Sequence, residues 1–143
     1  MKAIDLMVFD FDGTLVSSGE DIATSVNLTL RDLGLEGLER EKVIGFVGDG
    51  VKKLIERALC EEHRDLFDRA LTKFKDFYAE HLLDTTGLYP GVGEILQYFK
   101  EKRKVILTNK NYAFTITIAR ALGLEAHFDD IIDYVLDSYL QDN

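Results

Sequence analysis

The chain has 143 residues and a mass of 16.2 kDa, the size of one domain or of a small core that carries an inserted subdomain. Hydrophobic residues make up 46% of the chain and charged residues 30%, a composition that excludes a disordered or collagen-like chain. The formal net charge of −9 disfavours binding to nucleic acid or to anionic lipid, so a site for an anionic substrate needs a metal ion, a lysine or backbone N–H groups.

The first predicted element is a short buried strand, Ile4 to Asp10, in which an apolar run ends in charge. The helical spacing of apolar residues then predicts a helix from Glu20 to Leu33. Two shorter helices are predicted from Arg40 to Phe46 and from Val51 to about Cys60. We expect Cys60, the only cysteine, to close the buried face of the second of these helices.

The rest of the chain alternates helices with strands. The longest predicted helix lies between Glu62 and Leu83, and a helix from Val92 to Lys100 follows a turn. A second buried strand is predicted from Lys104 to Leu107, and a helix from about Asn111 to Leu122 comes after it. The apolar pattern also allows a third strand from Ile131 to Leu136, for which the sequence offers no obvious packing partner.

The helical residues between the first two strands are too many for a simple crossover connection, which usually needs about a dozen residues. We therefore predict that residues 17–85 form an inserted helical subdomain. Residues 1–16 and 86–143 then form an α/β core around a parallel sheet.

Two aspartates follow the first strand, in the stretch Asp10-Phe11-Asp12-Gly13-Thr14. Ligands bind at the carboxyl ends of strands in open parallel sheets. Two neighbouring carboxylates repel each other unless a cation or a proton intervenes, so they indicate either a Mg²⁺ site or an acid/base pair. Gly13 allows a backbone bend and is expected to expose N–H groups to an anion. The simpler alternative is a strand that ends in a polar turn.

The stretch Asp10 to Leu15 resembles the first motif of the haloacid dehalogenase-like phosphohydrolases, and Leu107-Thr108-Asn109-Lys110 resembles their second motif. Three further segments are similar to those of phosphoglycolate phosphatases with a helical cap: Glu20 to Ala23, Phe46 to Val51 and Tyr89 to Val92. The resemblance covers about residues 4 to 132. It implies a Rossmann-like core, here incomplete, with residues 17–85 as the helical cap.

The resemblance also implies a reaction. Asp10 would attack phosphorus and form an aspartyl-phosphate, which water then hydrolyses. Asp12 would protonate the leaving oxygen and later activate the water. The Asp10 carboxylate and the Asp12 carbonyl would hold the Mg²⁺ cofactor, and Gly13 and Thr14 would contact the substrate.

Five other residues are assigned to substrate binding by the resemblance, and each has a structural alternative. Thr108 and Asn109 would contact phosphate through a hydroxyl and an N–H group, or they begin the following helix as cap residues. Gly48, Asp49 and Gly50 would help to select the substrate, or they form an ordinary helix-start turn in which Asp49 is the cap.

The family's last two motifs, a lysine and a later strand that ends in aspartates, are not found, so the chain looks truncated. Lys110 could replace the lysine, but as the third residue of a turn it is expected to point to solvent. The late acidic group of Asp129, Asp130, Asp133 and Asp137 is expected to be a solvated tail. The strand from Ile4 to Asp10 would then be an unpaired edge, which predicts a homodimer, a swapped assembly or a displaced C-terminal tail that covers this edge.

The sequence therefore predicts a Mg²⁺-dependent phosphatase of small phosphate monoesters, whose partner is a small phosphorylated metabolite and neither nucleic acid nor a membrane. The alternative is a catalytically inactive module that acts by binding or oligomerisation. A receiver-like phosphorelay domain is a third reading, against which the long helical insertion argues. The lone cysteine and the absence of a leader or membrane-length apolar run predict a cytoplasmic location.

Overall fold

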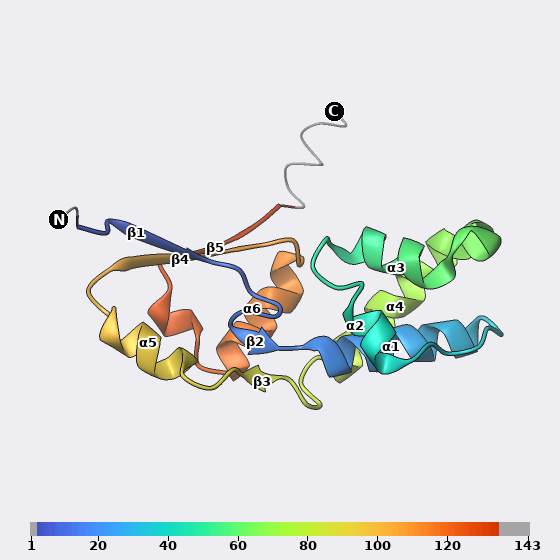
Figure 1. Cartoon of the computed structure of the whole chain (residues 1–143), viewed down its shortest axis with the longest axis horizontal. Coiled ribbons are helices and arrows are strands. Elements are labelled where there is room, and N and C mark those ends of the chain that lie inside the picture. The colour runs from blue at the N-terminus through green and yellow to red at the C-terminus, as the bar shows by residue number, and fades with distance from the viewer. Residues whose placement is uncertain (1–2, 135–143) are drawn as a thin grey trace. The chain divides into compact units, whose positions relative to one another are not determined.

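The computed structural model describes residues 3–134 and has a mixed α/β fold. Its contacts divide the chain into two compact units (Figure 1). The α/β unit comprises Met1–Ser17 and Gly87–Asn143, and the helical unit comprises Ser18–Thr86.

The α/β unit is built on a three-stranded parallel sheet in the order β1-β4-β5. Its strands are β1 (Leu6–Phe9), β4 (Arg103–Thr108) and β5 (Asp130–Asp133). The connecting helices are α5 (Val92–Tyr98), α6 (Tyr112–Ala121) and the short 3-10 helix η2 (Glu125–His127). The predicted α/β class with a parallel sheet is confirmed, and the expected third strand finds its partner in β4. Of the range predicted for that strand, Val135 and Leu136 lie outside the described residues.

The two faces of this sheet differ in burial because side chains alternate along a strand. On one face Lys104, Ile106 and Thr108 are buried, and α5 and α6 lie on one side of the sheet in Figure 1. On the other face Leu6 and Val8 remain 48% and 54% exposed. The sheet is thus covered on one side by the described residues, and β1 is one of its two edge strands.

A second, two-stranded antiparallel sheet joins the segments on either side of the helical unit. It consists of β2 (Val16–Ser17) and β3 (Gly87–Leu88), with Val16 opposite Leu88 and Ser17 opposite Gly87. The sequence analysis missed both strands, because two residues are too short to carry an alternating pattern.

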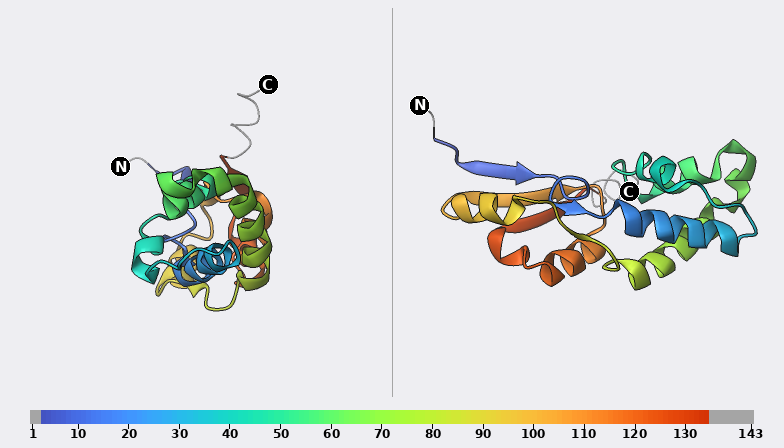
Figure 2. Two further views of the ribbon diagram at one scale, coloured as in Figure 1. Left: turned by 90° about the vertical axis from the view of Figure 1, so that its right-hand side faces the viewer. Right: turned by 60° about the horizontal axis from the view of Figure 1, so that its bottom comes forward.

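The helical unit contains four α-helices among its described residues: α1 (Gly19–Asp32), α2 (Arg40–Ile44), α3 (Val51–Leu59) and α4 (Phe67–His81). The helix α1 packs along α4, and α3 packs against α4 as well (Figure 2). The predicted apolar stripes form this core, which includes Ile22, Val26, Leu30, Leu54, Ile55, Leu59, Ala70, Phe74, Tyr78 and Leu82. Within residues 3–134, every helix is too short or too polar to cross a bilayer.

Two predictions about this unit are wrong. The longest helix does not begin near Glu62, because a 3-10 helix η1 (Glu61–Leu66) precedes α4 and departs from helical geometry at His63. Cys60 does not close a buried helix face: it is exposed, and its φ of +58° places it in the left-handed region. A residue in that conformation ends α3, so the chain changes direction before Cys60 could join the core.

Candidate active site

The candidate catalytic residues of the α/β unit follow two neighbouring parallel strands. Asp10 comes directly after β1, and Thr108 is the last residue of β4. The two strands run parallel, with Phe9 opposite Ile106. Their carboxyl ends therefore meet at one edge of the sheet, the edge at which α/β proteins bind ligands.

The loop after β1 folds tightly around the main chain of Phe11, whose side chain is fully buried. The Phe11 carbonyl accepts hydrogen bonds from the N–H groups of Thr14, Leu15 and Val16 at 3.0 to 3.2 Å. Gly13 has a φ of +80°, which permits the sharp bend, and its N–H donates to the Val16 carbonyl at 3.0 Å. The expectation that this loop offers the Gly13 N–H to an anion is therefore wrong, since the loop uses that donor itself.

The two aspartates of the loop have different surroundings. Asp10 is exposed, and its Oδ1 accepts a hydrogen bond from the Phe11 N–H at 2.7 Å. The Asp12 side chain is only 13% exposed. One carboxylate is thus accessible to a substrate, while the other lies in a less polar setting where a partner is needed.

Lys110 supplies that partner. Its Nζ lies 3.1 Å from Oδ1 and 3.2 Å from Oδ2 of Asp12, and the lysine side chain is 7% exposed. Burial lowers the pKa of Lys110 below its ordinary value, although the Asp12 carboxylate opposes this shift. The expectation that Lys110 points to solvent is wrong, because the ends of β1 and β4 bring it against the loop that follows β1.

Thr108 and Asn109 do not cap the next helix. The N-cap of α6 is Asn111, whose Oδ1 accepts a hydrogen bond from the Phe114 N–H at 2.8 Å. The Thr108 side chain is buried, and its hydroxyl oxygen accepts a hydrogen bond from the Lys110 N–H at 3.1 Å. Asn109 is exposed at the same strand end. The cap interpretation of Thr108 and Asn109 is therefore wrong.

Asp133 lies at the end of β5, directly opposite Thr108 in the sheet. It is buried, and its Oδ2 accepts a hydrogen bond from the Tyr112 N–H at 2.6 Å, at the start of α6. Asp129 likewise accepts from the Lys104 N–H at 2.8 Å. The expectation of a solvated acidic group is wrong for Asp133, which is buried, whereas Asp129 and Asp130 are exposed. Asp137 lies outside the described residues. The alternation along β5 was the signal that could have placed Asp133 on the covered face.

Gly48, Asp49 and Gly50 belong to the helical unit. Gly50 is the N-cap of α3, and both glycines have positive φ angles. Asp49 does not cap the helix, because its Oδ2 accepts a hydrogen bond from Nη2 of Arg57 at 2.6 Å. Arg57 also donates to the Phe46 carbonyl at 2.9 Å. This ion pair and hydrogen bond fix the loop to α3, which gives it a defined shape.

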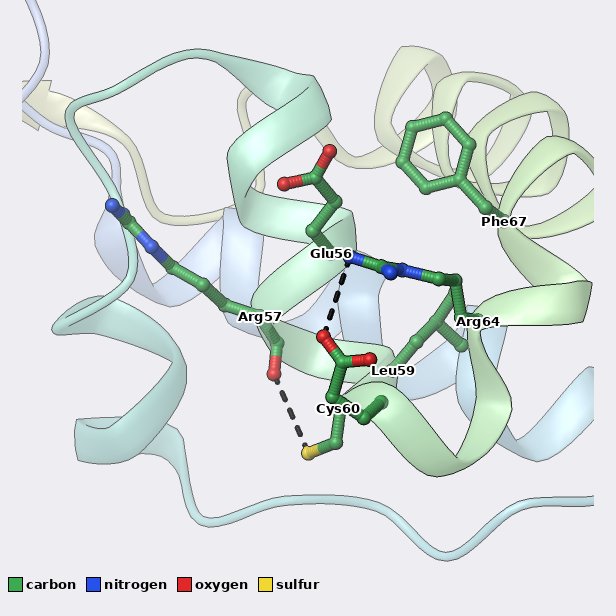
Figure 3. A pocket seen from close by; sticks show the side chains of 7 residues that line it. Glu56, Arg57, Leu59, Cys60, Arg64 and Phe67 are labelled. Atoms are coloured by element: carbon green, nitrogen blue, oxygen red, sulfur yellow. Dashed lines mark hydrogen bonds and ion pairs between the residues drawn. The ribbon is translucent and has the colours of Figure 1, made fainter.

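The helical unit also contains a cavity of about 380 Å³ (Figure 3). The charged groups around it have partners: Arg64 pairs with Glu61 at 3.3 Å, and Arg57 pairs with Asp49. An apolar hollow of about 200 Å³ lies in the α/β unit beside Thr14. The residues that line the first cavity are Glu56, Arg57, Leu59, Cys60, Glu61, Arg64 and Phe67, none of which was predicted as a site residue.

The donor set at the end of β1 can be tested against the coordination of Mg²⁺. This ion takes oxygen ligands, often one or two carboxylates together with substrate phosphate and water. Asp10 offers an exposed carboxylate, and Asp12 can add its carbonyl oxygen while its carboxylate pairs with Lys110. Among residues 3–134, no three His, Cys, Asp or Glu side chains gather as a metal cluster. The residues fit a Mg²⁺ ion that shares its coordination with a bound phosphate.

Comparison with known proteins adds sequence relatives. The chain is 37% identical over 139 residues to a phosphoglycolate phosphatase of Chromobacterium violaceum, a match that covers 92% of this chain and 63% of the relative. It is 32% identical to the phosphoglycolate phosphatase of Aquifex aeolicus, covering 89% of this chain and 59% of that protein. The chain thus spans less than two thirds of the length of these curated relatives.

Solved structures agree with the sequence relatives. A predicted phosphoglycolate phosphatase from Haemophilus somnus 129PT superposes with a TM-score of 0.83 at 30% identity, covering 90% of this chain and 61% of that one. A haloacid dehalogenase-like family protein from Streptococcus pneumoniae has the same fold, with a TM-score of 0.82 at 24% identity over 97% of this chain and 70% of that one. The family model of the haloacid dehalogenase-like hydrolases matches residues 4–140. The chain therefore belongs to the haloacid dehalogenase-like hydrolases.

Proposed function

We propose that this chain carries the nucleophile and the acid/base group of a Mg²⁺-dependent phosphatase of small phosphate monoesters. The observation that carries the proposal is the contrast between the two aspartates of one loop. Asp10 is exposed at the end of β1, whereas Asp12 is nearly buried and paired with Lys110. Two carboxylates in different environments can take different roles in one reaction.

In the proposed reaction, an Asp10 oxygen attacks the phosphorus and the bond to the leaving oxygen breaks, which leaves an aspartyl-phosphate. Asp12 gives a proton to the leaving oxygen. A water molecule then attacks the phosphorus, Asp12 takes a proton from that water, and the bond to Asp10 breaks to release inorganic phosphate. The Nζ of Lys110 lies within hydrogen-bond distance of both oxygens of the Asp12 carboxylate.

The remaining proposed site residues bind and orient the phosphate. A Mg²⁺ ion held by Asp10 and the Asp12 carbonyl would neutralise phosphate charge, which suits a protein of net charge −9. Asn109 and the Thr14 hydroxyl lie at exposed positions from which they can donate to phosphate oxygens. Thr108 is buried, and its hydroxyl oxygen supports the turn by accepting a hydrogen bond from the Lys110 N–H.

The proposed substrate class is a small phosphorylated acid such as 2-phosphoglycolate. The support is that several relatives at 32 to 37% identity are phosphoglycolate phosphatases. We assign Gly48, Asp49 and Gly50 to substrate selection, because Arg57 holds this glycine-flanked loop in one conformation. A single cysteine is compatible with the reducing cytoplasm, which is the proposed location.

A second candidate is a module that binds phosphate without turnover. It is favoured by the absence, among residues 3–134, of a group of three His, Cys, Asp or Glu side chains that could hold a metal ion. This candidate predicts binding of phosphate that does not lead to its release from esters.

The test is Mg²⁺-dependent phosphate release from 2-phosphoglycolate and from p-nitrophenyl phosphate. Asp10→Asn should lower kcat by at least about a thousandfold, because it removes the nucleophile. Chelation of the metal should abolish the wild-type activity. The matched control is Asp5→Asn, which changes an exposed aspartate that precedes β1 and should leave kcat unchanged.

The two candidates give opposite results. Turnover by the wild type and by Asp5→Asn, but not by Asp10→Asn, supports the phosphatase. A wild type that binds inorganic phosphate but releases none from either ester supports the binding module. Comparable activity in Asp10→Asn would show that another residue is the nucleophile.

A further inference from the structure

We infer that Lys110 is a positioning residue for the second half of the proposed reaction, in which it fixes the Asp12 carboxylate in the orientation that takes a proton from the attacking water. The inference rests on the proposed function and adds a residue to it. Lys110 touches neither the phosphorus nor the water in this scheme. It acts through Asp12.

The contact between the two side chains involves both carboxylate oxygens. Nζ of Lys110 lies 3.1 Å from Oδ1 and 3.2 Å from Oδ2 of Asp12, so one ammonium group bridges them. A hydrogen bond to one oxygen leaves a carboxylate able to rotate about its last bond. A contact with both oxygens restricts this rotation and therefore fixes the plane of the carboxylate.

The main chain on each side of the contact is also held. The N–H of Lys110 donates to the Thr108 hydroxyl at 3.1 Å, which anchors the lysine to the end of β4. Asp12 forms an isolated bridge with Val16, in the loop that closes on the Phe11 carbonyl. The ammonium and the carboxylate thus extend from two restrained turns. Little conformational entropy of these side chains is therefore lost during the reaction.

Burial makes this orientation depend on the lysine. The Asp12 side chain is 13% exposed and that of Lys110 is 7% exposed, so water competes weakly for either group. Removal of Lys110 takes a contact with both oxygens away from a largely buried carboxylate, and the carboxylate then turns toward its other donors or toward solvent. The expected consequence is a misplaced base and an intact nucleophile, because Asp10 is exposed and takes its hydrogen bond from Phe11.

The two halves of the reaction can be separated with p-nitrophenyl phosphate. Its leaving group departs without needing a proton, so attack by Asp10 does not depend on Asp12. Lys110→Met should therefore leave kcat/KM within about threefold of wild type, while kcat falls at least about tenfold because hydrolysis of the aspartyl-phosphate slows. Rapid mixing should show a burst of about one p-nitrophenolate per chain, followed by slow turnover.

Further variants make the test specific. Lys110→Arg keeps the positive charge and two-point contact and should recover most of kcat. Lys100→Met, the matched control, removes an exposed lysine and should behave as wild type. In an Asp12→Asn background, Lys110→Met should lower kcat no further, because the inferred role of the lysine in turnover is exerted through the Asp12 carboxylate. Circular dichroism checks folding, and Lys110→Gln replaces Lys110→Met if the methionine variant does not fold.

The outcomes separate this inference from the proposed function. A wild type without turnover overturns the proposed function and the inference together. An active wild type with unchanged kcat in Lys110→Met overturns the inference alone. So does an equal fall in kcat and kcat/KM without a burst, which would place Lys110 in the first step, and so does a further loss of kcat in the Asp12→Asn background.

Discussion

Asp21 is a charged residue with an exposed fraction of only 1%, at the start of α1. Its carboxylate accepts hydrogen bonds from the N–H groups and the hydroxyls of both Thr85 and Thr86, at 2.7 to 3.0 Å. Burial raises the pKa of Asp21, but these hydrogen bonds together hold it below its ordinary value of 3.8. The ionised carboxylate therefore stabilises the fold by joining the two ends of the helical unit.

Asp21→Asn should lower the free energy of unfolding by about 2 to 3 kcal/mol near neutral pH, because an amide turns an NH₂ group toward donors. The folded-state pKa is depressed, so the contribution of Asp21 is fully present above the unfolded value and is lost as the pH falls through the folded value. The stability gap between wild type and variant should therefore narrow below about pH 4. Urea unfolding of both proteins at several pH values measures this difference in the free energy of unfolding.

Asp76→Asn is the control for this prediction, since Asp76 is an exposed residue of α4. It should change the free energy of unfolding by less than about 0.5 kcal/mol. An Asp21→Asn protein as stable as this control at neutral pH would contradict the role assigned to Asp21.

At the scale of single residues, the sequence predicted which residues belong to the site better than it predicted which residues they contact. The two aspartates after β1 could be predicted as site residues, because carboxylates at the end of an apolar strand are costly to desolvate. The partner of Asp12 could not be predicted, because Lys110 is distant in the sequence and its contact depends on the register of β1 against β4. The same holds for Asp133, whose burial depends on the pairing of β5 with β4.

The start of α6 shows how one element is fixed by its neighbours. Asn111 is the N-cap and accepts from the Phe114 N–H, while Asp133 of the adjacent strand accepts from the Tyr112 N–H. Two N–H groups of the first turn, which a helix leaves without internal partners, are thus satisfied by side chains. The helix α6 is thereby attached to the end of β5, which lies opposite Thr108 of β4.

Asn111→Ala should lower the free energy of unfolding by about 1 kcal/mol, because the Phe114 N–H loses its acceptor. Thermal or urea unfolding measures this change. The matched control is Glu39→Ala at the N-cap of α2, where no side-chain hydrogen bond caps the helix. Equal effects of the two substitutions would show that the cap of α6 contributes nothing particular.

Among the helices and strands, those with a long apolar pattern could be predicted from the sequence, whereas the short ones could not. The strand β4 and the helices α1, α3 and α6 lie where their patterns placed them, because each buries a continuous face. The strand β1 also lies within its predicted range, but the prediction that it is buried is wrong, since its residues are half-buried or exposed. The strands β2 and β3 were not predicted, because they are defined by their pairing with each other and not by an alternation of side chains. The positive φ of Cys60 was not predicted either, because a non-glycine residue rarely adopts it.

At the scale of the α/β unit, one face of the sheet leaves apolar side chains exposed to water, which is unfavourable. Leu6, Val8 and Ile132 are 48%, 54% and 44% exposed, and β1 is an edge strand among the described residues. An apolar edge strand pairs readily with another chain. We propose that this 143-residue chain self-associates through β1, with a second copy adding its own strand at that edge.

Analytical ultracentrifugation should show association that increases with concentration. Leu6→Lys with Val8→Lys should weaken it at least about tenfold, because lysine side chains on an edge strand oppose its pairing with another chain. Tyr98→Lys, which replaces an apolar residue of α5 that is 80% exposed, should leave association unchanged. A monomer over the whole concentration range, or equal effects of the two changes, would contradict the proposed assembly.

The antiparallel pairing of β2 with β3 has a consequence for how such a chain can change over evolution. Ser17 lies directly opposite Gly87, so the segment between them starts and ends at the spacing of a hairpin. A two-residue turn could close the same gap. The register of the sheet in the α/β unit would therefore be kept if residues 18–86 were shortened, exchanged or deleted. Another module that binds a different substrate could be inserted at this position during evolution.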